Sequence, residues 1–367
     1  MLLRLSATLA LVANTFAHSH DADLRVGKIA TYDEDGGKAS GPTRKASIAI
    51  ATTILNPGPQ IVQWMDYHLH QVGVQHVLIY MDDPSERLLF SQLCADRPVT
   101  LLGGSQIEQK MSPESRLILR QEQNMKHAIS HLFKHGYDWL LHIDIDELLY
   151  EPSAAAASWS EKPEVGSVHF TNHEALPLSH HTDNPFEDCV WFRLNTVEQR
   201  PHYMAYGNGK SAVRLTRGVI PQGPHDFSGF KGERLAPSGN GDEPVLLHYP
   251  TPSFQTWVEK FTRYGDFSDY WFGDRRVPNR VQFMLRSRDL VQEAHKTGDW
   301  SRARTFFDQQ ILADVNERRE AINKGHVRYY APFAEREGGY APFAAGLGGI
   351  QETLLYSGEN LDAVGMQ

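Results

Sequence analysis

The sequence predicts an α/β fold in which a mixed sheet is flanked by helices and followed by a helical C-terminal extension. Between residues 46 and 147, apolar, β-branched runs of strand length alternate with segments of helical periodicity, which is the order of a doubly wound parallel sheet. Beyond residue 152 the strand candidates are short and follow one another without helices, which indicates antiparallel additions. The chain has 367 residues, of which 41% are hydrophobic, so it can form a large core.

The first half of the chain shows the alternation most clearly. Ser47–Leu55 is a β-branched strand that ends at a Pro- and Gly-rich turn, and residues 60–72 then repeat apolar side chains at helical spacing up to Gly73. Further elements are expected as a strand at 76–81, a helix at 85–95, a strand at 99–102, a helix at 113–135 and a strand at 139–143. In such a sheet, ligands bind outside the carboxyl ends of the strands.

The second half is expected to add short strands and then helices. Strand candidates lie at 167–171, 189–193, 211–216 and 244–248. From Ser253 the chain becomes helical and aromatic, with a charged amphipathic helix expected at 300–324. We therefore divide the chain into one large domain at 46–270 and a helical extension at 271–367.

The N-terminus predicts entry into the secretory pathway, to the Golgi lumen or to secretion. Residues 1–17 place the basic Arg4 before an apolar run that ends in small residues spaced for signal-peptidase cleavage. Residues 18–45 are polar and aperiodic, which predicts a flexible lead-in. An uncleaved Golgi-type membrane anchor and a transit peptide are the alternatives. Two cysteines, Cys94 and Cys189, fit either a disulfide or two buried thiols.

The overall charge argues against nucleic-acid binding. The chain has 36 Lys and Arg residues against 45 Asp and Glu residues, which gives a formal net charge of −9. A broad nucleic-acid surface requires the opposite balance. A phosphorylated small ligand would therefore depend on a few local basic residues or on a metal ion.

A cluster of carboxylates, Asp144-Ile145-Asp146-Glu147, follows the apolar run 139–143. If the strand continues, Asp144 and Asp146 point to the same face and can share one cation, while Glu147 leaves the strand line. Mg²⁺ and Mn²⁺ prefer such oxygen ligands. The sequence therefore predicts a divalent-metal site here, with a solvated strand end as the alternative.

Other polar residues are expected near the same sheet edge. Asp82 and Asp83 end the second strand, where a carboxylate meets a ribose or a base in many nucleotide-binding sheets, or else forms a turn. Arg120 lies on the helix before the acidic cluster, where it would either contact a diphosphate or face solvent.

Three residues of the second half complete the set of candidates. Lys210 follows a glycine-containing loop that lacks the Walker spacing, but it would still neutralise a phosphate. His225 is placed in a loop and His248 at a strand end. A neutral imidazole is an acceptable third ligand for Mn²⁺ beside two carboxylates, although either histidine could be structural.

Several motifs in order resemble glycosyltransferase family 92 and its family 2-like relatives, which have the GT-A fold. The resemblance covers roughly residues 46–264, and its most specific element is the stretch from Trp139 to the acidic cluster. The motifs are Gln63-Trp64-x-x-Tyr67-His68, Gly73-Val74, a strand ending at Tyr80, Asp138-Trp139-Leu140, Ile143-Asp144-Ile145-Asp146-Glu147, Gly209-Lys210-Ser211, His225 and His248-Tyr249.

The resemblance implies that residues 46–270 are the catalytic domain of a metal-dependent hexosyltransferase. Such an enzyme takes a sugar from a nucleotide diphosphate, commonly UDP, and transfers it with inversion to a glycan or glycoprotein. Asp146 would bind Mn²⁺ or Mg²⁺ directly, and Asp144 would lie nearer the ribose. His248 or His225 would complete the coordination.

The resemblance also implies roles for residues away from the acidic cluster. Asp82 or Asp83 would hold the nucleoside, and Lys210 would hold the donor phosphates. An in-line displacement needs a base that deprotonates the acceptor hydroxyl. Glu174 is the first candidate for this base and Asp226 the second. The stretch around Glu174 lacks the glycine that is typical of the family.

Two other functions are compatible with parts of the sequence. A phosphatase-like hydrolase would use Asp144 as a nucleophile, but three strand-helix units precede the cluster and Glu147-Leu148 follows where Thr or Val would be expected. The second alternative is a non-catalytic secreted carbohydrate-binding protein on a transferase scaffold. Transfer of an isotopic label to Asp144 would support the hydrolase, and a lack of UDP binding in the presence of Mn²⁺ would support the non-catalytic protein.

Overall fold

The computed structural model describes residues 45–58, 60–104, 113–151, 157–194, 207–237, 243–271, 274–279, 281–312 and 315–333. The expected signal peptide and the lead-in up to residue 44 lie outside these residues, so the secretory location and the membrane association stay predictions. Within the described part of the chain, no helix is long and apolar enough to cross a membrane.

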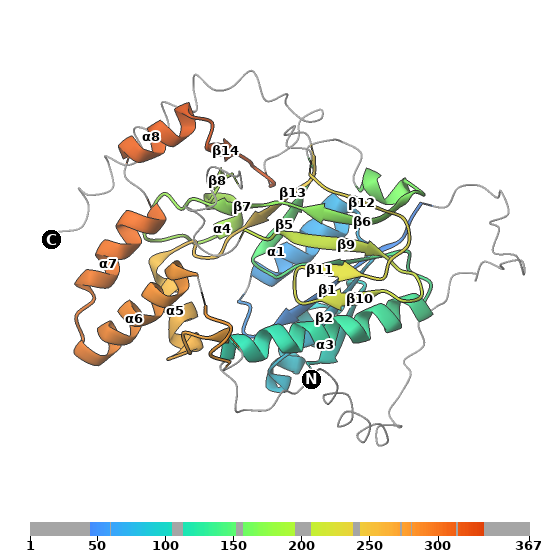
Figure 1. Ribbon diagram of the computed structural model, residues 1–367, viewed down its shortest axis with the longest axis horizontal. Helices are drawn as coiled ribbons and strands as arrows, with labels where there is room; N and C mark the ends of the chain where they lie inside the picture. The colour runs from blue at the N-terminus through green and yellow to red at the C-terminus, as the bar shows by residue number, and fades with distance from the viewer. Residues whose placement is uncertain are drawn as a thin grey trace, which may run out of the picture. The chain divides into compact units, whose positions relative to one another are not determined.

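A seven-stranded mixed sheet forms the centre of the protein, in the order β12-β6-β9-β4-β1-β2-β3 (Figure 1). β1 (Ile48–Ile54) pairs in parallel with both β2 (His76–Met81) and β4 (Trp139–His142). β3 (Val99–Gly103) extends this parallel half beyond β2. Every residue of β1, β2 and β4 is buried, as expected for parallel strands that are covered on both faces.

The other half of the central sheet contains antiparallel strands, as predicted. β9 (Lys210–Arg214) runs antiparallel to β4, and β6 (Val165–Phe170) runs antiparallel to β9. β12 (Glu233–Leu235) forms the edge beside β6. A separate two-stranded hairpin consists of β10 (Ile220–Gln222) and β11 (Asp226–Ser228). The predicted mixed α/β sheet is therefore confirmed.

A second, five-stranded sheet has the order β14-β8-β7-β13-β5. Its strands are β14 (Val327–Tyr329), β8 (Trp191–Arg193), β7 (Asn172–Ala175), β13 (Val245–His248) and β5 (Glu147–Tyr150). The sequence predicts that the late strands join one sheet, and for β8 and β13 this is wrong. The chain turns after β4, so that β5 becomes an antiparallel partner of β13 and starts a new ladder.

Helices cover both faces of the central sheet. α3 (Pro113–Lys134) packs on one face, whereas α1 (Gln60–Asp66) and its π-helical continuation η1 (Tyr67–Val72) pack on the other. Side chains of β1 alternate accordingly: Ala49 and Ala51 pack with α3, and Ile48, Ile50 and Ile54 pack with α1. The shorter helices are η2 (Pro84–Glu86), α2 (Arg87–Leu93), η3 (Ser158–Glu161) and α4 (Pro185–Asp188).

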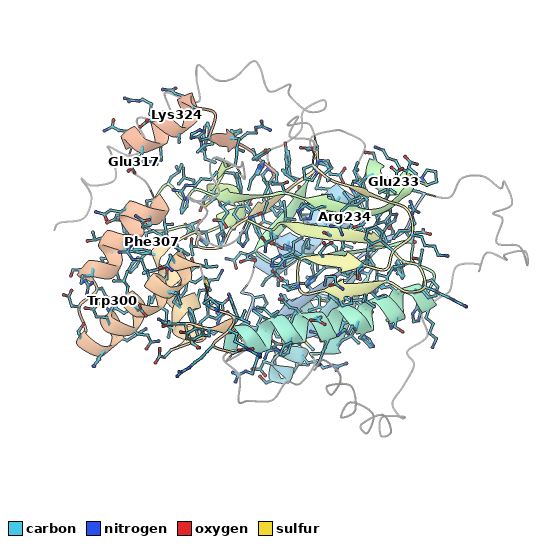
Figure 2. All side chains as sticks on the ribbon, in the orientation of Figure 1. Glu233, Arg234, Trp300, Phe307, Glu317 and Lys324 are labelled. Atoms are coloured by element: carbon cyan, nitrogen blue, oxygen red, sulfur yellow. The ribbon has the colours of Figure 1, made fainter. Side chains whose placement is uncertain are left out.

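The C-terminal helices share an apolar cluster of their own. α5 (Phe254–Tyr264), α6 (Gln282–Thr297) and α7 (Ser301–Phe307) contribute aromatic and aliphatic residues to it, and Figure 2 shows Trp300 and Phe307 among these helices. The single helix expected at 300–324 is divided into α7, the π-helical turn η6 (Asp308–Leu312) and α8 (Val315–Asn323). α5 and α6 share this cluster across the predicted domain boundary at residue 270, which stays a prediction.

The two cysteines are free thiols, and both are buried. The Cys94 thiol lies 3.7 Å from the sulfur of Met65. Burial raises the pKa of the Cys189 thiol to about 12, so this side chain stays protonated. Of the two alternatives that the sequence allows, the structure shows two buried thiols.

Candidate active site

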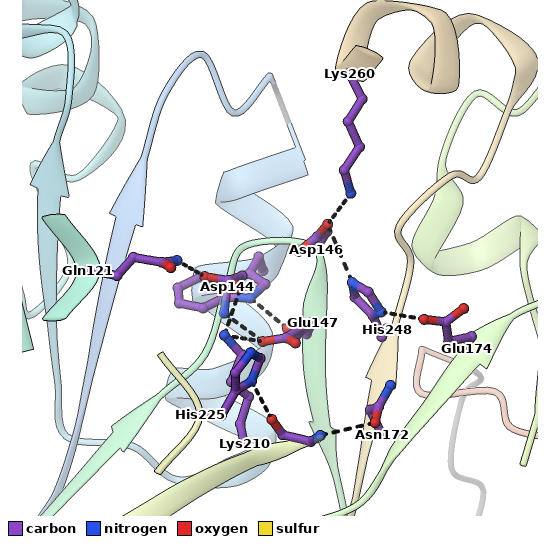
Figure 3. Close-up of polar contacts among 12 residues, drawn as sticks. Gln121, Asp144, Asp146, Glu147, Asn172, Glu174, Lys210, His225, His248 and Lys260 are labelled. Atoms are coloured by element: carbon purple, nitrogen blue, oxygen red, sulfur yellow. Dashed lines mark hydrogen bonds and ion pairs between the residues drawn. The ribbon is translucent and has the colours of Figure 1, made fainter. Parts of the chain in front are cut away.

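The acidic residues 144–147 form a tight turn between two strands of different sheets. β4 ends at His142 and β5 begins at Glu147, and the Glu147 N–H donates to the Asp144 carbonyl oxygen over 3.2 Å. The expectation that Asp144 and Asp146 share one strand face is therefore wrong, because the strand geometry ends before them. Their carboxylates consequently have different partners (Figure 3).

Hydrogen bonds from three parts of the chain fix this turn. The Trp64 indole N–H on α1 donates to the Glu147 carbonyl oxygen over 2.7 Å. The Asp144 N–H donates to the Glu147 carboxylate over 2.7 Å, and the Tyr249 N–H donates to the Asp146 carbonyl oxygen over 2.8 Å. The turn is thus held by a bond within itself, by α1 and by the residue that follows β13.

Asp144 is bound on both oxygens by side chains of the central domain. Lys210 Nζ lies 2.7 Å from Asp144 Oδ2, and the Gln121 amide on α3 donates to Asp144 Oδ1 over 2.7 Å. The Lys210 side chain is only 1% exposed. Burial opposes its charge, but the carboxylates of Asp144 and Glu147 outweigh this effect and raise the pKa of Lys210. Lys210 is therefore a charged, buried partner of the turn.

Glu147 faces the interior beside this pair. Its carboxylate is buried and lies 3.8 Å from Lys210 Nζ. Burial raises the pKa of Glu147 to about 8, against the opposing attraction of Lys210. Lys210 therefore lies between two acidic side chains, at hydrogen-bond distance from Asp144 and farther from Glu147.

Asp146 points to a different group of residues, on the side of the second sheet. Asp146 Oδ2 lies 3.7 Å from His248 Nε2, and His248 Nδ1 lies 3.3 Å from Glu174 Oε1. Burial lowers the pKa of His248, but the carboxylates on both sides of the ring outweigh it and raise the pKa to about 10. Burial also opposes the charge of Asp146, yet its contacts with His248 and Lys260 hold the pKa of Asp146 below its usual range.

The register of the second sheet places these three side chains together. β13 pairs with β5 so that His248 lies opposite Glu147, one residue after Asp146. β13 also pairs in parallel with β7, with His248 beside Glu174. β7 and the turn that leads into β5 therefore supply the carboxylates that contact the two ring nitrogens of His248.

A lysine of the C-terminal helices also reaches this group. Lys260 on α5 places Nζ 3.7 Å from Asp146 Oδ2, and Figure 3 shows its side chain extending from the helix towards the turn. The same ammonium donates to the Pro250 carbonyl oxygen over 3.2 Å. Asp146 thus has two cationic neighbours, His248 and Lys260, at the same oxygen.

The predicted nucleoside-binding residues lie at the end of β2. Asp82 is paired with Arg120 of α3, with Oδ2 and Nη2 2.7 Å apart. Asp83 accepts from the Ser85 N–H over 2.8 Å and so caps the short helix η2. The structure therefore brings Asp82 and Arg120 together, while Asp83 has a local turn role. Their function in nucleotide binding stays a prediction.

The other predicted residues have partners outside the acidic turn. His225 Nδ1 lies 2.8 Å from the Gly209 carbonyl oxygen, and burial lowers its pKa to about 4. Asp226 forms a bidentate ion pair with Arg234 at 2.7 and 2.8 Å. Glu174 is buried against His248. Glu174 thus contacts His248 and Asp226 contacts Arg234, and the assignment of either carboxylate as the base stays a prediction.

A divalent cation at Asp146 would have one neighbouring histidine as a second protein ligand and would need further ligands from outside the protein. Among the described residues, no group of three or more His, Cys, Asp or Glu side chains is arranged to bind a metal ion. Mg²⁺ typically takes only one or two carboxylates and completes its shell with phosphates and water. Neighbouring ligands in its octahedral shell lie about 3 Å apart, somewhat less than the 3.7 Å between Asp146 and His248. Asp146 and His248 would be its protein ligands, and His248 would release the proton on Nε2 when the cation binds.

Two residues that contact the acidic turn are absent from the sequence prediction. Gln121 directly follows Arg120 on α3, so the predicted position of Arg120 already pointed to this part of the helix. Lys260 lies in no recognisable motif, and it is brought to Asp146 only by the packing of α5. The sequence carried no signal that would have identified it.

Comparisons with known proteins give the following matches. No protein-family model matches the sequence. A glycosyltransferase-like protein of Arabidopsis thaliana is 24% identical over 338 residues, which cover 79% of this chain and 72% of that protein. A second one from the same plant is 27% identical over 171 residues, which cover 41% of this chain and 33%, about one third, of the relative.

Solved structures give matches of low similarity. Staphylococcus aureus TarS, in its complex with UDP-GlcNAc, matches with a TM-score of 0.32 and 7% identity over 76% of this chain and 79% of that chain. A glycosyltransferase that acts in glycosylation of the major capsid of the virus PBCV-1 matches with a TM-score of 0.20 and 10% identity over 35% of this chain and 52% of that chain. The similarity in sequence is to the two glycosyltransferase-like proteins of Arabidopsis thaliana.

Proposed function

We propose that this protein is a metal-dependent glycosyltransferase that transfers a hexose from a UDP-sugar to a glycan or glycoprotein, with inversion. The observation that carries the proposal is the pairing of Asp146 with His248 beside Asp144, at an edge where strands of the two sheets meet. The similarity to glycosyltransferase-like proteins supports the same class of reaction. The resemblance of the motifs to family 92 supports the finer assignment.

In this proposal the two aspartates of the acidic turn have different roles. Asp146 and His248 hold the cation, whose positive charge would stabilise the negative charge that develops on the leaving diphosphate. Asp144 is fixed by Lys210 and by Gln121 of α3. The same helix carries Arg120, which pairs with Asp82 at the end of β2. We assign this side of the turn to the nucleoside.

Lys210 supports the site indirectly. An ammonium that is 1% exposed and 2.7 Å from Asp144 cannot reach a donor phosphate without leaving both Asp144 and the buried carboxyl group of Glu147. We therefore assign it to holding the shape and charge of the turn. The sequence-based expectation that Lys210 binds the phosphates is not the role that this geometry favours.

Binding of UDP to the purified protein tests the proposal. We expect UDP to raise the melting temperature in the presence of Mn²⁺ and not in the presence of EDTA, since a ligand at a hundred times its dissociation constant adds about 2.7 kcal/mol of stability. Asp146→Asn should abolish the effect. Glu259→Gln, an exposed substitution on α5, is the control. Equal stabilisation with and without Mn²⁺, or none, would contradict the metal-dependent assignment.

A further inference from the structure

The two lysines near the acidic turn differ in their environment. Lys210 is 1% exposed and is enclosed by the turn and the central sheet. Lys260 is 25% exposed and approaches Asp146 from the other side, out of α5. Only Lys260 can therefore change partners without breaking a buried ion pair.

The position of Lys260 follows from the start of α5. Ser253 caps this helix: its hydroxyl accepts from the Thr256 N–H over 3.1 Å, and the Thr256 hydroxyl lies 3.0 Å from the Ser253 N–H. The cap lies five residues after His248, so the loop that leaves β13 leads directly into the helix. Trp257 and Phe261, on either side of Lys260 in the sequence, are buried in the apolar cluster of the C-terminal helices. The backbone at Lys260 is therefore held in place, while its long side chain can move.

The contact between Lys260 and Asp146 is loose. Nζ lies 3.7 Å from Asp146 Oδ2, which is longer than a charge-assisted hydrogen bond, and its shorter contact is the 3.2 Å bond to the Pro250 carbonyl oxygen. His248 Nε2 is also 3.7 Å from that same carboxylate oxygen. The 37% exposed side chain of Asp146 is thus the outward end of the site.

We propose that Lys260 is an exchangeable counter-ion, which pairs with Asp146 in the free protein and moves to the diphosphate of the donor when a divalent cation is bound. The inference rests on the function proposed above. A cation on Asp146 repels the ammonium of Lys260 and removes the charge that held it there. A diphosphate bound to the same cation offers new acceptors within reach of the flexible side chain.

This exchange predicts effects of opposite sign for the two ligands. Without Lys260, Asp146 has one competitor fewer, so Mn²⁺ alone should bind more tightly. UDP should bind less tightly in the presence of Mn²⁺, because one cationic contact to phosphate is lost. Thermodynamic linkage requires that Mn²⁺ and UDP strengthen each other's binding by the same factor. We expect this common factor to be smaller without Lys260.

Binding measurements on the full chain test this. Mn²⁺ affinity is measured by electron paramagnetic resonance of the free ion, and UDP affinity by calorimetry, for the wild type, Lys260→Met and Lys260→Arg. We expect Lys260→Met to bind Mn²⁺ alone about threefold more tightly, the size of effect known for partly exposed ion pairs. It should bind UDP with Mn²⁺ about tenfold more weakly, and Lys260→Arg should recover most of this loss.

The outcomes separate this inference from the proposed function. Lys296→Met, an exposed substitution on α6, serves as the control and should change neither affinity. If Lys260→Met weakens both ligands, or leaves UDP binding unchanged while the wild type binds UDP with Mn²⁺, the exchange is wrong and the proposed function stands. If the wild type itself does not bind UDP with Mn²⁺, the proposed function fails first.

Discussion

Replacing Lys210 by methionine tests how the acidic turn is held together. Lys210 forms an ion pair with Asp144 at 2.7 Å while its side chain is 1% exposed. Lys126 forms an ion pair with Glu122 at the same distance of 2.7 Å, but its side chain is 56% exposed. The substitutions Lys210→Met and Lys126→Met therefore remove pairs of equal geometry and different burial.

The structure predicts a large difference between the two variants. Removing one partner of a buried ion pair costs about 3–5 kcal/mol, because the other charge is left in a poorly solvated place. Asp144 is 28% exposed and keeps its bond to Gln121, so we expect the lower end, about 3 kcal/mol. An exposed helical pair four residues apart contributes only about 0.3–0.5 kcal/mol. Methionine keeps most of the apolar stem of lysine, which limits the loss of packing.

Urea denaturation at neutral pH measures both values. The midpoint of Lys210→Met should fall clearly below that of the wild type with an unchanged slope, while the midpoint of Lys126→Met should hardly move. Similar midpoints for the two variants would refute the reasoning, because burial would then not decide the strength of the pair. A stable Lys210→Met protein with a selective loss of UDP affinity would instead return Lys210 to the phosphate-binding role that the sequence suggested.

The remaining predictions concern two histidines. Glu174→Gln should weaken Mn²⁺ binding about tenfold, because a carboxylate that accepts from a metal-bound imidazole orients the ring. Paramagnetic resonance of Mn²⁺ measures this affinity. An unchanged affinity would contradict the orienting role and leave Glu174 available as the base. His68 accepts from the Leu149 N–H and contacts the Trp64 carbonyl oxygen, and burial lowers its pKa from 6.5 to about 3. The unfolded chain therefore gains a proton below about pH 6.5 that the folded chain does not, and stability should fall by about 1.4 kcal/mol per pH unit down to about pH 3. In urea titrations at two pH values, His68→Gln should show a smaller acid-induced loss than the wild type, and an equal loss would contradict this.

The central sheet was predictable because its strands carry strong local signals. β1 and β2 are buried runs of seven and six residues, most of them apolar or β-branched, and turn residues or helices of clear periodicity follow them. The second sheet was not predictable in the same way. β7 has the sequence Asn-His-Glu-Ala, and all four residues are buried, so its placement depends on partners far away in the chain rather than on its own propensity.

The candidate site was located from the sequence more successfully than its roles were assigned. Asp144, Asp146, Lys210 and His248 do come together around one turn. We assumed from the sequence that the strand continues through the cluster, and we therefore predicted that both aspartates share one metal ion. Only the second sheet, whose existence the sequence did not indicate, directs Asp146 away from Asp144 and towards His248.

The two carboxylates of the Asp-x-Asp pattern therefore differ in their environment, although the sequence pattern treats them alike. Asp144 has Lys210 and Gln121 as close partners, so a cation that approached it would have to displace a buried ammonium. Asp146 has looser side-chain contacts at 3.7 Å, with a buried histidine and with a lysine whose side chain is 25% exposed. A cation consequently gains more at Asp146 than at Asp144, and the pattern is better understood as one structural anchor followed by one ligand.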